Sequence, residues 1–555
     1  MTDPTVYGLF RAAAAEAPDR AFLVIPPSAS GAYAPGGVTL TYAEGLARIE
    51  DRRAAYAAAG YGHGHRVAIL LENRPDFIVH WLALNALGVS VVPVNPYYRS
   101  AELTYLLDHS DCVLAVGVPE RVADLETAAA AAGRCLPAVR ADDPPPEAPP
   151  PPRGDAPTGA SECALMYTSG TTGRPKGCML SNDYYAGVGR WYVDQGGLAA
   201  VEYGRERMLT PLPLFHMNAM ACSVVAMLLA RGTLIQLDRF HPSTWWSDVR
   251  DTGATIVHYL GVMPAILLNL PENPAERDNR VKFGFGANVD PAQHIPFEER
   301  FGFPLIEGWA MTETGAGATI VANRPPHDPG KRCIGRPDGC EARIVDDDDN
   351  EVPDGTPGSL IVRKSADDPR RLFFSGYYKD EATTERDWRG GWFHTGDVAM
   401  RAPDGRFYFV DRDKNIIRRS GENIAALEVD TELVKHPAVA QVAVIAAPDP
   451  VRGEEVMACV VPAAGPERDG ERDGERDGER DGERDEATAR SLVEWCLARL
   501  AYYKAPGWVL FLDELPVTAT NKIRKADLKD LGGDPAKNPA AIDLRSMKKA
   551  PRPAA

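Results

Sequence analysis

Apolar and polar residues alternate in helical and strand-like patterns through the first quarter of the chain. Residues 43–59 form an alanine-rich helical pattern, and residues 66–71 (RVAILL) read as a short strand. Residues 76–86 are apolar at helical spacing, and residues 89–94 (VSVVPV) read as a second buried strand. Strand–helix–strand order of this kind predicts an α/β domain with a parallel sheet.

The pattern changes further along the chain. Residues 142–157 (DDPPPEAPPPPRGDAP) are proline-rich and polar, which predicts an exposed, extended connector. More α/β alternation follows to about residue 330. Between residues 335 and 409, short strand patterns are separated by PDG and DDDDN turns, which predicts a smaller β-rich section. We therefore expect a large N-terminal domain over residues 1–410.

A second boundary is expected near Asp411, followed by a compact α+β domain over residues 411–530. Its expected elements are an amphipathic segment, two strands, a helix and a third strand, at residues 424–436, 439–445, 455–461, 487–500 and 507–512. The predicted fold class is therefore α/β, with a large N-terminal domain that includes a small β-rich section, and a smaller, mobile α+β C-terminal domain.

The expected small domain is interrupted by a repetitive polar segment. Residues 466–486 hold four ERDG units and a fifth that ends in Glu. Each unit has two acids, one base and no apolar residue, so the segment cannot bury surface and is predicted to be a disordered insertion. A functional role for it is the alternative. Residues 531–555 form a tail that we expect to be frayed from about Asp534.

The length, composition and net charge of the chain limit the classes of function. A chain of 555 residues suggests two to four domains, and 44% hydrophobic with 25% charged residues is ordinary for a soluble globular protein. The formal charge of −17 argues against general nucleic-acid binding and against adsorption to an anionic membrane. No signal-peptide pattern or apolar run of membrane-spanning length is present, and the nine cysteines form no CxxC pair. We therefore expect a cytoplasmic protein with reduced thiols and no membrane span.

A glycine-rich stretch suggests the chemistry. Residues 167–177 (YTSGTTGRPKG) follow the apolar run CALM, and they combine glycine-freed backbone amides with hydroxyls, Arg174 and Lys176. Such a loop suits phosphate oxygens. It is not a Walker P-loop, because Lys176 is followed by Gly177 rather than Ser or Thr. From these residues alone, a mobile surface loop is the alternative.

The same stretch closely resembles the phosphate-binding signature of the adenylate-forming, or AMP-binding, enzyme superfamily. Six further segments resemble the superfamily's signatures in the same order. The resemblance as a whole covers about residues 5–530. The segments are PLPLFHMNA (211–219), GFGAN (284–288), EGWAMTETG (307–315), GWFHTGD (391–397), FVDRDKNIIRRSGENIAALEVD (409–430) and LPVTATNKIRKADL (515–528). The resemblance is to the acyl-CoA synthetase type, including carnitine-CoA and fatty-acyl-CoA ligases.

The resemblance implies a reaction in two steps. A carboxylate attacks the α-phosphorus of ATP, which gives acyl-AMP and pyrophosphate, and the thiol of CoA then displaces AMP. ATP, CoA, Mg²⁺ and a carboxylic acid are the implied cofactors and partners, and no nucleic acid is implied. The protein is expected to be a monomer or a homodimer. The alternatives are an adenylation enzyme that loads an acyl group onto a carrier protein, a luciferase-like enzyme, and a non-catalytic protein that kept the fold.

The resemblance also implies catalytic roles. Lys522 is expected to contact the substrate carboxylate and the α-phosphate together, and Glu313 to bind Mg²⁺. Thr312 would hydrogen-bond the α-phosphate, and His216 would lie between the acyl pocket and the nucleotide. From the residues alone, Thr312 and Glu313 fit the first turn of a helix, His216 fits a core histidine, and the lysines near Lys522 fit an exposed basic surface. Asn521 stands where the family usually has Gly, and Asn tolerates positive φ.

Nucleotide and CoA binding are implied for a larger set of residues. Trp309 stands where the family usually has Tyr and would stack on adenine. Asp397, which on its own fits a turn residue, would bind the ribose hydroxyls together with Arg412. Lys414 would lie at the hinge, and Gly421 would let CoA approach closely. The full expected set is Thr168, Ser169, Gly170, Thr171, Thr172, Gly173, Lys176, Gly286, Ala287, Asn288, Glu307, Gly308, Trp309, Ala310, Met311, Asp397, Arg412, Lys414, Gly421, Glu422 and Asn423.

The identity of the acid is left open. The pocket walls are expected from residues 262–267, 284–288 and 309–311. In acetate-restricted relatives a second Trp shortens the pocket, and here that position is Ala310, so we expect a pocket longer than acetate needs. Chain length, aryl or alkyl character and the pathway do not follow from the sequence.

Overall fold

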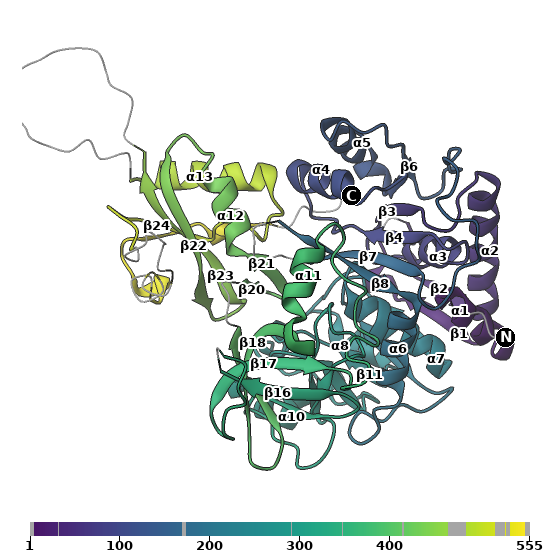
Figure 1. The fold of residues 1–555 in the computed structure, drawn as a ribbon. Coiled ribbons are helices and arrows are strands. Elements are labelled where there is room, and N and C mark those ends of the chain that lie inside the picture. The colour runs from purple at the N-terminus through teal and green to yellow at the C-terminus, as the bar shows by residue number, and fades with distance from the viewer. Residues whose placement is uncertain are drawn as a thin grey trace, which may run out of the picture. The chain divides into compact units, whose positions relative to one another are not determined.

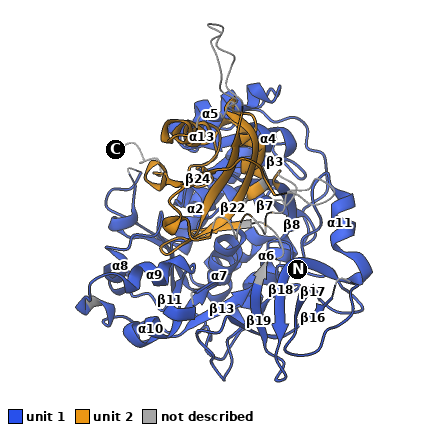
Figure 2. Ribbon diagram, turned by 90° about the vertical axis from the view of Figure 1, so that its left-hand side faces the viewer, with its two compact units in different colours: residues 1–96, 103–168, 176–413 blue, residues 97–102, 169–175, 414–555 orange. Residues whose placement is uncertain are grey.

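The computed structural model describes residues 5–31, 33–168, 174–289, 291–346, 348–412, 416–463, 484–516, 525, 528 and 533–549 (Figure 1). These residues fall into two compact units (Figure 2). The first covers residues 1–96, 103–168 and 176–413, and the second covers residues 97–102, 169–175 and 414–555. Each unit is described by itself below.

In the first unit, one sheet contains the strands expected near the N-terminus. Its order is β6-β5-β3-β4-β7-β8, parallel except for the last pair, β7 and β8. The predicted helices and strands over residues 43–94 are confirmed, with bounds that differ by no more than one residue at each end. A capping box between Thr41 and Glu44 begins helix α2. The elements are α2 Tyr42–Ala58, β3 Arg66–Leu70, α3 Pro75–Asn85, β4 Ser90–Pro93, α4 Ser100–His109, β5 Leu114–Gly117, α5 Val122–Ala131, β6 Ala138–Arg140, β7 Glu162–Thr168 and β8 Lys176–Ser181.

The predicted connector over residues 142–157 is confirmed as a segment without helix or strand. It is held at two points, because the Ala148 amide donates to the Ala59 carbonyl at 2.8 Å and the Arg153 amide donates to the His63 carbonyl at 3.1 Å. The connector therefore follows the end of α2 before β7 begins.

The second sheet of this unit joins a parallel half to an antiparallel half. Its order is β16-β17-β18-β19-β15-β14-β13-β12-β11-β9-β10-β1-β2. Strands β1, β10, β9, β11, β12 and β13 pair in parallel. The predicted β-rich section is confirmed, and it continues this sheet rather than forming a separate one, since β14 pairs with both β13 and β15. The strands are β1 Ala21–Ile25, β2 Val38–Thr41, β9 Arg207–Thr210, β10 Thr233–Gln236, β11 Ile256–His258, β12 Phe283–Gly286, β13 Leu305–Trp309, β14 Ile320–Val321, β15 Cys333–Pro337, β16 Glu341–Val345, β17 Pro357–Arg363, β18 Phe393–Arg401 and β19 Phe407–Arg412.

Helices of the same unit pack on these strands, and α9 and α10 contribute to the core around Trp245 and Phe301. Within the described residues, no helix is both long and apolar enough to cross a bilayer. Every cysteine is a free thiol, as predicted; Cys135 is exposed, Cys340 is half-buried and the others are buried. The helices are α1 Val6–Glu16, α6 Asn182–Val193, α7 Ala226–Ala230, α8 Trp245–Asp251, α9 Val262–Leu268, α10 Pro291–Phe301 and α11 Glu381–Asp387.

The second unit is an α+β structure, as predicted. Its sheet has the order β21-β20-β23-β24-β25, and β22 pairs with β23. Helices α12 and α13 bury Val429, Leu492 and Val493 in the core of this unit. The elements are β20 Ile416–Arg419, β21 Glu422–Ala425, α12 Ala426–Leu433, β22 Val439–Asp449, β23 Gly453–Pro462, α13 Glu486–Arg499, β24 Trp508–Phe511 and β25 Ala541–Asp543.

Two predictions about this unit need correction. The end of the predicted insertion is ordered, because Asp485 accepts a hydrogen bond from the Thr488 amide at 2.8 Å and α13 begins at Glu486. The rest of that repeat, residues 464–483, lies outside the described residues. The tail is not frayed at residue 534, because β25 pairs antiparallel with β24 and Leu544 is buried in the core. Apolar Ile542 and Leu544 outweigh the polar composition around them.

Candidate active site

The residues expected at adenine and ribose are in direct contact. Trp309 ends β13 and is 6% exposed, and its Nε1–H donates to Oδ2 of Asp397 on β18 at 2.8 Å. The Asp397 amide donates to Oγ1 of Thr395 at 3.0 Å, and that hydroxyl donates to the Leu360 carbonyl at 2.7 Å. Trp in place of Tyr therefore does more than keep an aromatic ring, because its N–H fixes the orientation of the carboxylate. Arg412 faces Asp397 across the β18–β19 pair.

The loop expected at adenine lies close to β13. A Cβ at Gly286 would lie 2.3 Å from the Tyr259 carbonyl oxygen, so only glycine allows this approach. Asn288 has a φ of 62°. Buried Glu307 accepts the Val289 amide at 2.9 Å through Oε1, and burial raises the pKa of Glu307. The structure therefore brings residues 286–288 together with residues 307–309.

The predicted metal ligand and the predicted phosphate-binding lysine share one neighbour. The Tyr377 hydroxyl donates to Oε1 of buried Glu313 at 3.1 Å. The Lys176 ammonium lies 4.3 Å from the centre of the Tyr377 ring and 3.8 Å from Oδ2 of Asp387. Burial, and then the charge of Glu313, raise the pKa of Tyr377, so the phenol remains a neutral donor. Sequence reasoning missed Tyr377 and Asp387; the signal for Tyr377 was an aromatic pair in a polar stretch, SGYYKD, and that stretch does not include Asp387.

The ends of the glycine-rich stretch are neighbours in the sheet. Thr168 ends β7 and pairs with Lys176 at the start of β8. The segment around Thr312 is also fixed, because its carbonyl accepts the Tyr184 hydroxyl at 2.8 Å. One residue earlier, the Met311 amide, which follows Ala310, donates to Oγ1 of Thr314 at 3.0 Å.

The segment of His216 is fixed by one buried amide that sequence reasoning missed. Nδ2 of Asn73 donates to the Leu212 and Leu237 carbonyls, both at 3.0 Å, and Oδ1 accepts the Leu214 amide at 2.8 Å. These contacts tie the residues that follow β9 and β10 together, at the carboxyl ends of parallel strands. His216 is half-buried, with its ring centre 4.6 Å from that of Phe215.

In the second unit, the turn expected to face CoA joins β20 to β21. Ser420 and Gly421 have φ values of 51° and 90°, and Arg419 pairs with Glu422 across the turn. Two successive positive φ angles are typical of a tight hairpin turn, and Gly421 adopts its φ without strain.

Several expected residues lie outside what the structure describes. They are Ser169, Gly170, Thr171, Thr172, Gly173, Lys414 and Lys522, together with the side chains of Arg412 and Asn423. Lys525 is described, and the expectation that it is exposed is wrong. Its ammonium pairs with Oδ2 of Asp430 at 2.6 Å and donates to the Val444 carbonyl at 3.0 Å, so it anchors its segment to β22 and α12.

A histidine–glutamate–histidine group supports β13 from α10. Oε1 of Glu298 accepts from Nε2 of His294 at 3.1 Å, Nε2 of His327 at 2.7 Å and the Leu305 amide at 2.8 Å. Zn²⁺ uses ligands of this kind. However, the Gly330 amide donates to Nδ1 of His294 at 3.2 Å, so Nε2 carries the proton and is not available to a metal. Hydrogen bonds account for this group.

We expect Glu298→Gln to lower the free energy of unfolding by about 2 kcal/mol at neutral pH, because charge-assisted bonds are lost. Burial raises the pKa of Glu298, but its donors outweigh burial and lower the pKa to about 2. A carboxylate with a lowered pKa stabilises the fold only while ionised. The difference between the two proteins should therefore shrink as the pH falls below about 5.

Urea unfolding across this pH range measures the difference, with exposed Glu299→Gln as the matched control. An equal loss in the control would contradict the assignment, as would a rise in the melting temperature on adding Zn²⁺ to the unmodified protein.

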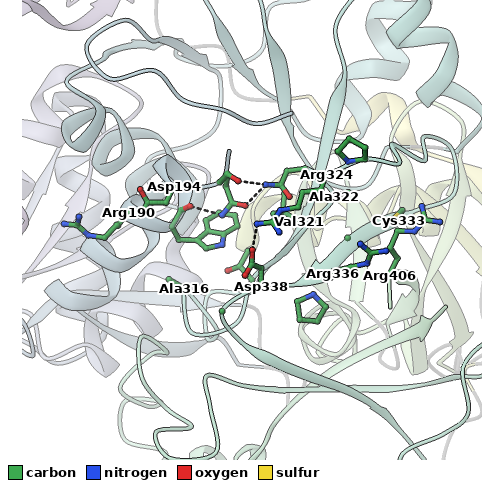
Figure 3. Close-up of a pocket in the computed structure, with 18 of the residues that line it drawn as sticks. Arg190, Asp194, Ala316, Val321, Ala322, Arg324, Cys333, Arg336, Asp338 and Arg406 are labelled. Carbon is green, nitrogen blue, oxygen red and sulfur yellow. Dashed lines mark hydrogen bonds and ion pairs between the residues drawn. The ribbon is translucent and has the colours of Figure 1, made fainter. Parts of the chain in front are cut away.

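A separate cavity of about 490 Å³ opens beside α6 (Figure 3). Arg190 and Trp191 line one side, and two ion pairs line the other: Arg324–Asp338 at 2.5 Å and Arg406–Asp328 at 3.0 Å. Of the expected residues that the structure describes, none lines this cavity.

Comparison with known proteins places the chain in a class, the nucleotide-dependent ligases. The family model for AMP-binding enzymes matches residues 10–378, and the model for the AMP-binding enzyme C-terminal domain matches residues 428–522. A sulfoacetate–CoA ligase of Cupriavidus necator is 34% identical over 545 residues, covering 95% of this chain and 98% of that protein. A feruloyl-CoA synthase of an Amycolatopsis species is 34% identical over 504 residues, covering 89% of this chain and 94% of that protein.

Among solved structures, a malonyl-CoA ligase in complex with methylmalonyl-CoA and AMP is 27% identical, with a TM-score of 0.70 and coverage of 90% of this chain and 97% of that chain. The chain belongs to the AMP-binding enzyme family. The predicted family, the fold class and the enzyme class, an acid–thiol ligase that forms AMP, are confirmed.

Proposed function

We propose that this protein activates a carboxylic acid with ATP and Mg²⁺ as acyl-AMP and transfers the acyl group to CoA. The observation that carries the proposal is the arrangement in the first unit. There, Trp309 orients Asp397, and Tyr377 lies between Glu313 and Lys176. This arrangement supports a nucleoside site and part of a phosphate site among residues of the first unit.

The first half-reaction joins two anions, so it needs charge neutralisation and positioning. Lys176 and the backbone amides of residues 169–173 would bind the β- and γ-phosphates. Thr312 would bind the α-phosphate, and Asp397 with Arg412 would bind the ribose. The Lys522 ammonium would contact the carboxylate and the α-phosphate together, so that the approach of the nucleophile is no longer repelled.

Glu313 fits a Mg²⁺ site. Its buried carboxylate is a hard oxygen ligand held by the Tyr377 hydroxyl, and Mg²⁺ favours one or two carboxylates with phosphate oxygens. When bound, the ion would neutralise phosphate charge. Tyr377 would keep Glu313 oriented in the free protein, because its phenol does not ionise near neutral pH.

The second half-reaction would use the second unit. Ser420 and Gly421 form a tight turn with little side-chain bulk, so a pantetheine arm could approach the backbone there. Lys522 belongs to the same unit, whereas Lys176, Glu313 and Asp397 belong to the first. We expect the two half-reactions to need different placements of the second unit, with Lys414 at the hinge.

The identity of the carboxylic acid substrate is to be determined by direct assay. The named relatives act on sulfoacetate and on ferulate, which share only the carboxylate. Ala310 leaves the end of β13 without a second large ring, which supports an acid larger than acetate. We also propose a cytoplasmic location, in keeping with the free thiols.

The test is to incubate the protein with ATP, Mg²⁺, CoA and a panel of carboxylic acids, following pyrophosphate and free thiol. We expect at least one acid to release pyrophosphate and consume thiol in equal amounts, and the reaction to stop when CoA or Mg²⁺ is omitted. Consumption of thiol only on a carrier protein would instead favour carrier loading. No acid-dependent exchange of labelled pyrophosphate into ATP with any acid would end the proposal.

A further inference from the structure

The C-terminal segment is connected, through Glu455 and Asp449, to the turn that the proposed function assigns to CoA. Lys548 is buried, and its ammonium pairs with the fully buried carboxylate of Glu455. Glu455 in turn accepts Nε of Arg419, at 2.8 Å through Oε1 and 2.7 Å through Oε2. Arg419 ends β20 and directly precedes Ser420. One chain of ionic contacts therefore runs from the tail to the first side of the turn.

A second chain of contacts reaches the same turn independently. Nη1 of Arg545 donates to Oδ2 of Asp449 at 2.9 Å, and Oδ1 of Asp449 accepts the Val451 and Arg452 amides at 2.9 and 2.8 Å. The Arg452 carbonyl then accepts the Ser420 amide at 3.1 Å. The tail thus fixes the β22–β23 connection, and that connection fixes the backbone of Ser420.

Gly507 allows the C-terminal segment and Glu455 to pack closely against the backbone before β24. A Cβ at Gly507 would lie 2.5 Å from Cγ of Glu455 and 3.0 Å from Cγ of Arg545. The Gly507 carbonyl also accepts the Leu544 amide at 2.8 Å. Glycine before β24 is therefore what lets the tail and Glu455 lie against the same backbone.

Ser420 needs such support because its φ of 51° lies in the left-handed region, which costs a non-glycine residue about 1 kcal/mol or more. A residue held in that region persists only where its surroundings fix it. Without the tail, Glu455 and Asp449 would each lose a partner, and the contacts through Arg419 and Arg452 that hold the turn would be less firmly fixed.

We propose that Lys548 and Arg545 are positioning residues for thioester formation, because they fix the Ser420–Gly421 turn for the approach of CoA. This inference rests on the proposed function. Neither residue is among the predicted nucleotide or carboxylate ligands of the first half-reaction. The loss of either side chain should therefore affect the two half-reactions unequally.

The Lys548 contact responds to pH near neutrality. Lys548 faces Glu455, Arg419, Arg452 and the Cys496 thiol. Burial, and then the charge of Arg419, lower the pKa of Lys548 to about 7 against the attraction of Glu455. Arginine keeps its proton, so lysine is the group that loses one. The ion pair with Glu455 is therefore strongest below about pH 7 and weakens above it.

The experiment compares Lys548→Met and Arg545→Met with Lys549→Met, an adjacent exposed lysine as the matched control. Acid-dependent pyrophosphate exchange measures adenylation, and single-turnover thioester formation from supplied acyl-AMP measures the CoA step. We expect both test variants to slow the CoA step about tenfold and raise the KM for CoA, while exchange stays within about twofold. The advantage of the unmodified protein over Lys548→Met should shrink from about pH 6 to pH 8.

Equal loss in both half-reactions, or no loss in the CoA step, overturns the inference. Arg545 is partly exposed, so its variant keeps the test decisive if Lys548→Met fails to fold. An unmodified protein that forms no thioester would contradict the proposed function, whereas an active protein with insensitive variants contradicts only the positioning role.

Discussion

Lys522→Ala should reduce acyl-AMP formation by about 10³-fold and change thioester formation from supplied acyl-AMP by less than about tenfold. The ammonium is the group expected to cancel repulsion between the substrate carboxylate and the α-phosphate. That repulsion exists only before the acyl-AMP bond forms. Pyrophosphate exchange with each acid measures the first effect, and single-turnover reaction of acyl-AMP with CoA measures the second.

Lys537→Ala is the matched control, because Lys537 lies in the same unit and its side chain is 84% exposed. It should leave both half-reactions unchanged. Parallel loss of both half-reactions in Lys522→Ala would contradict a role confined to adenylation, and full exchange activity would remove Lys522 from the mechanism.

Glu313→Gln should lower adenylation by about 10²–10³-fold and raise the Mg²⁺ concentration needed for half-maximal exchange. Gln keeps the shape of the side chain and an acceptor for the Tyr377 hydroxyl, so the change removes mainly the negative charge. Titration of exchange activity with Mg²⁺ at saturating ATP separates weaker metal binding from a slower chemical step.

Two further variants define this effect. Tyr377→Phe removes one hydrogen bond to Glu313 and should cost about tenfold or less, in keeping with a neighbour that orients the ligand. Exposed Glu385→Gln, in the same unit, should have no effect. If Glu313→Gln kept the Mg²⁺ dependence of the unmodified protein, the metal would have to be bound elsewhere.

Regular elements could be predicted where a single local pattern decides the outcome. The apolar runs of β3 and β4 and the helical spacing of α3 gave bounds close to those observed, because burial on both faces leaves little ambiguity over residues 66–94. The tail could not be predicted in this way. Ile542 and Leu544 are too few to make a periodic pattern, and only the edge of β24 gives them a partner.

Local sequence patterns were also insufficient to predict the whole candidate site. The resemblance identified residues that contact a ligand, such as Trp309, Asp397 and Glu313, because such residues stand in recognisable signatures. It did not identify Tyr377, which contacts Glu313, or Asn73, which fixes the segment of His216. These contacts cross sequence separations of 64 and 139 residues, which no local pattern contains.

The strand Ala541–Asp543 also bears on how the protein behaves in concentrated solution. While it is paired, it covers the outer edge of β24, whose Val509 and Leu510 belong to an apolar strand. A bare edge of this kind can template pairing with another chain, and natural sheets are shielded against it. Loosening the C-terminal segment would thus expose a surface prone to self-association, so solubility and the fit of the last residues are linked in this protein.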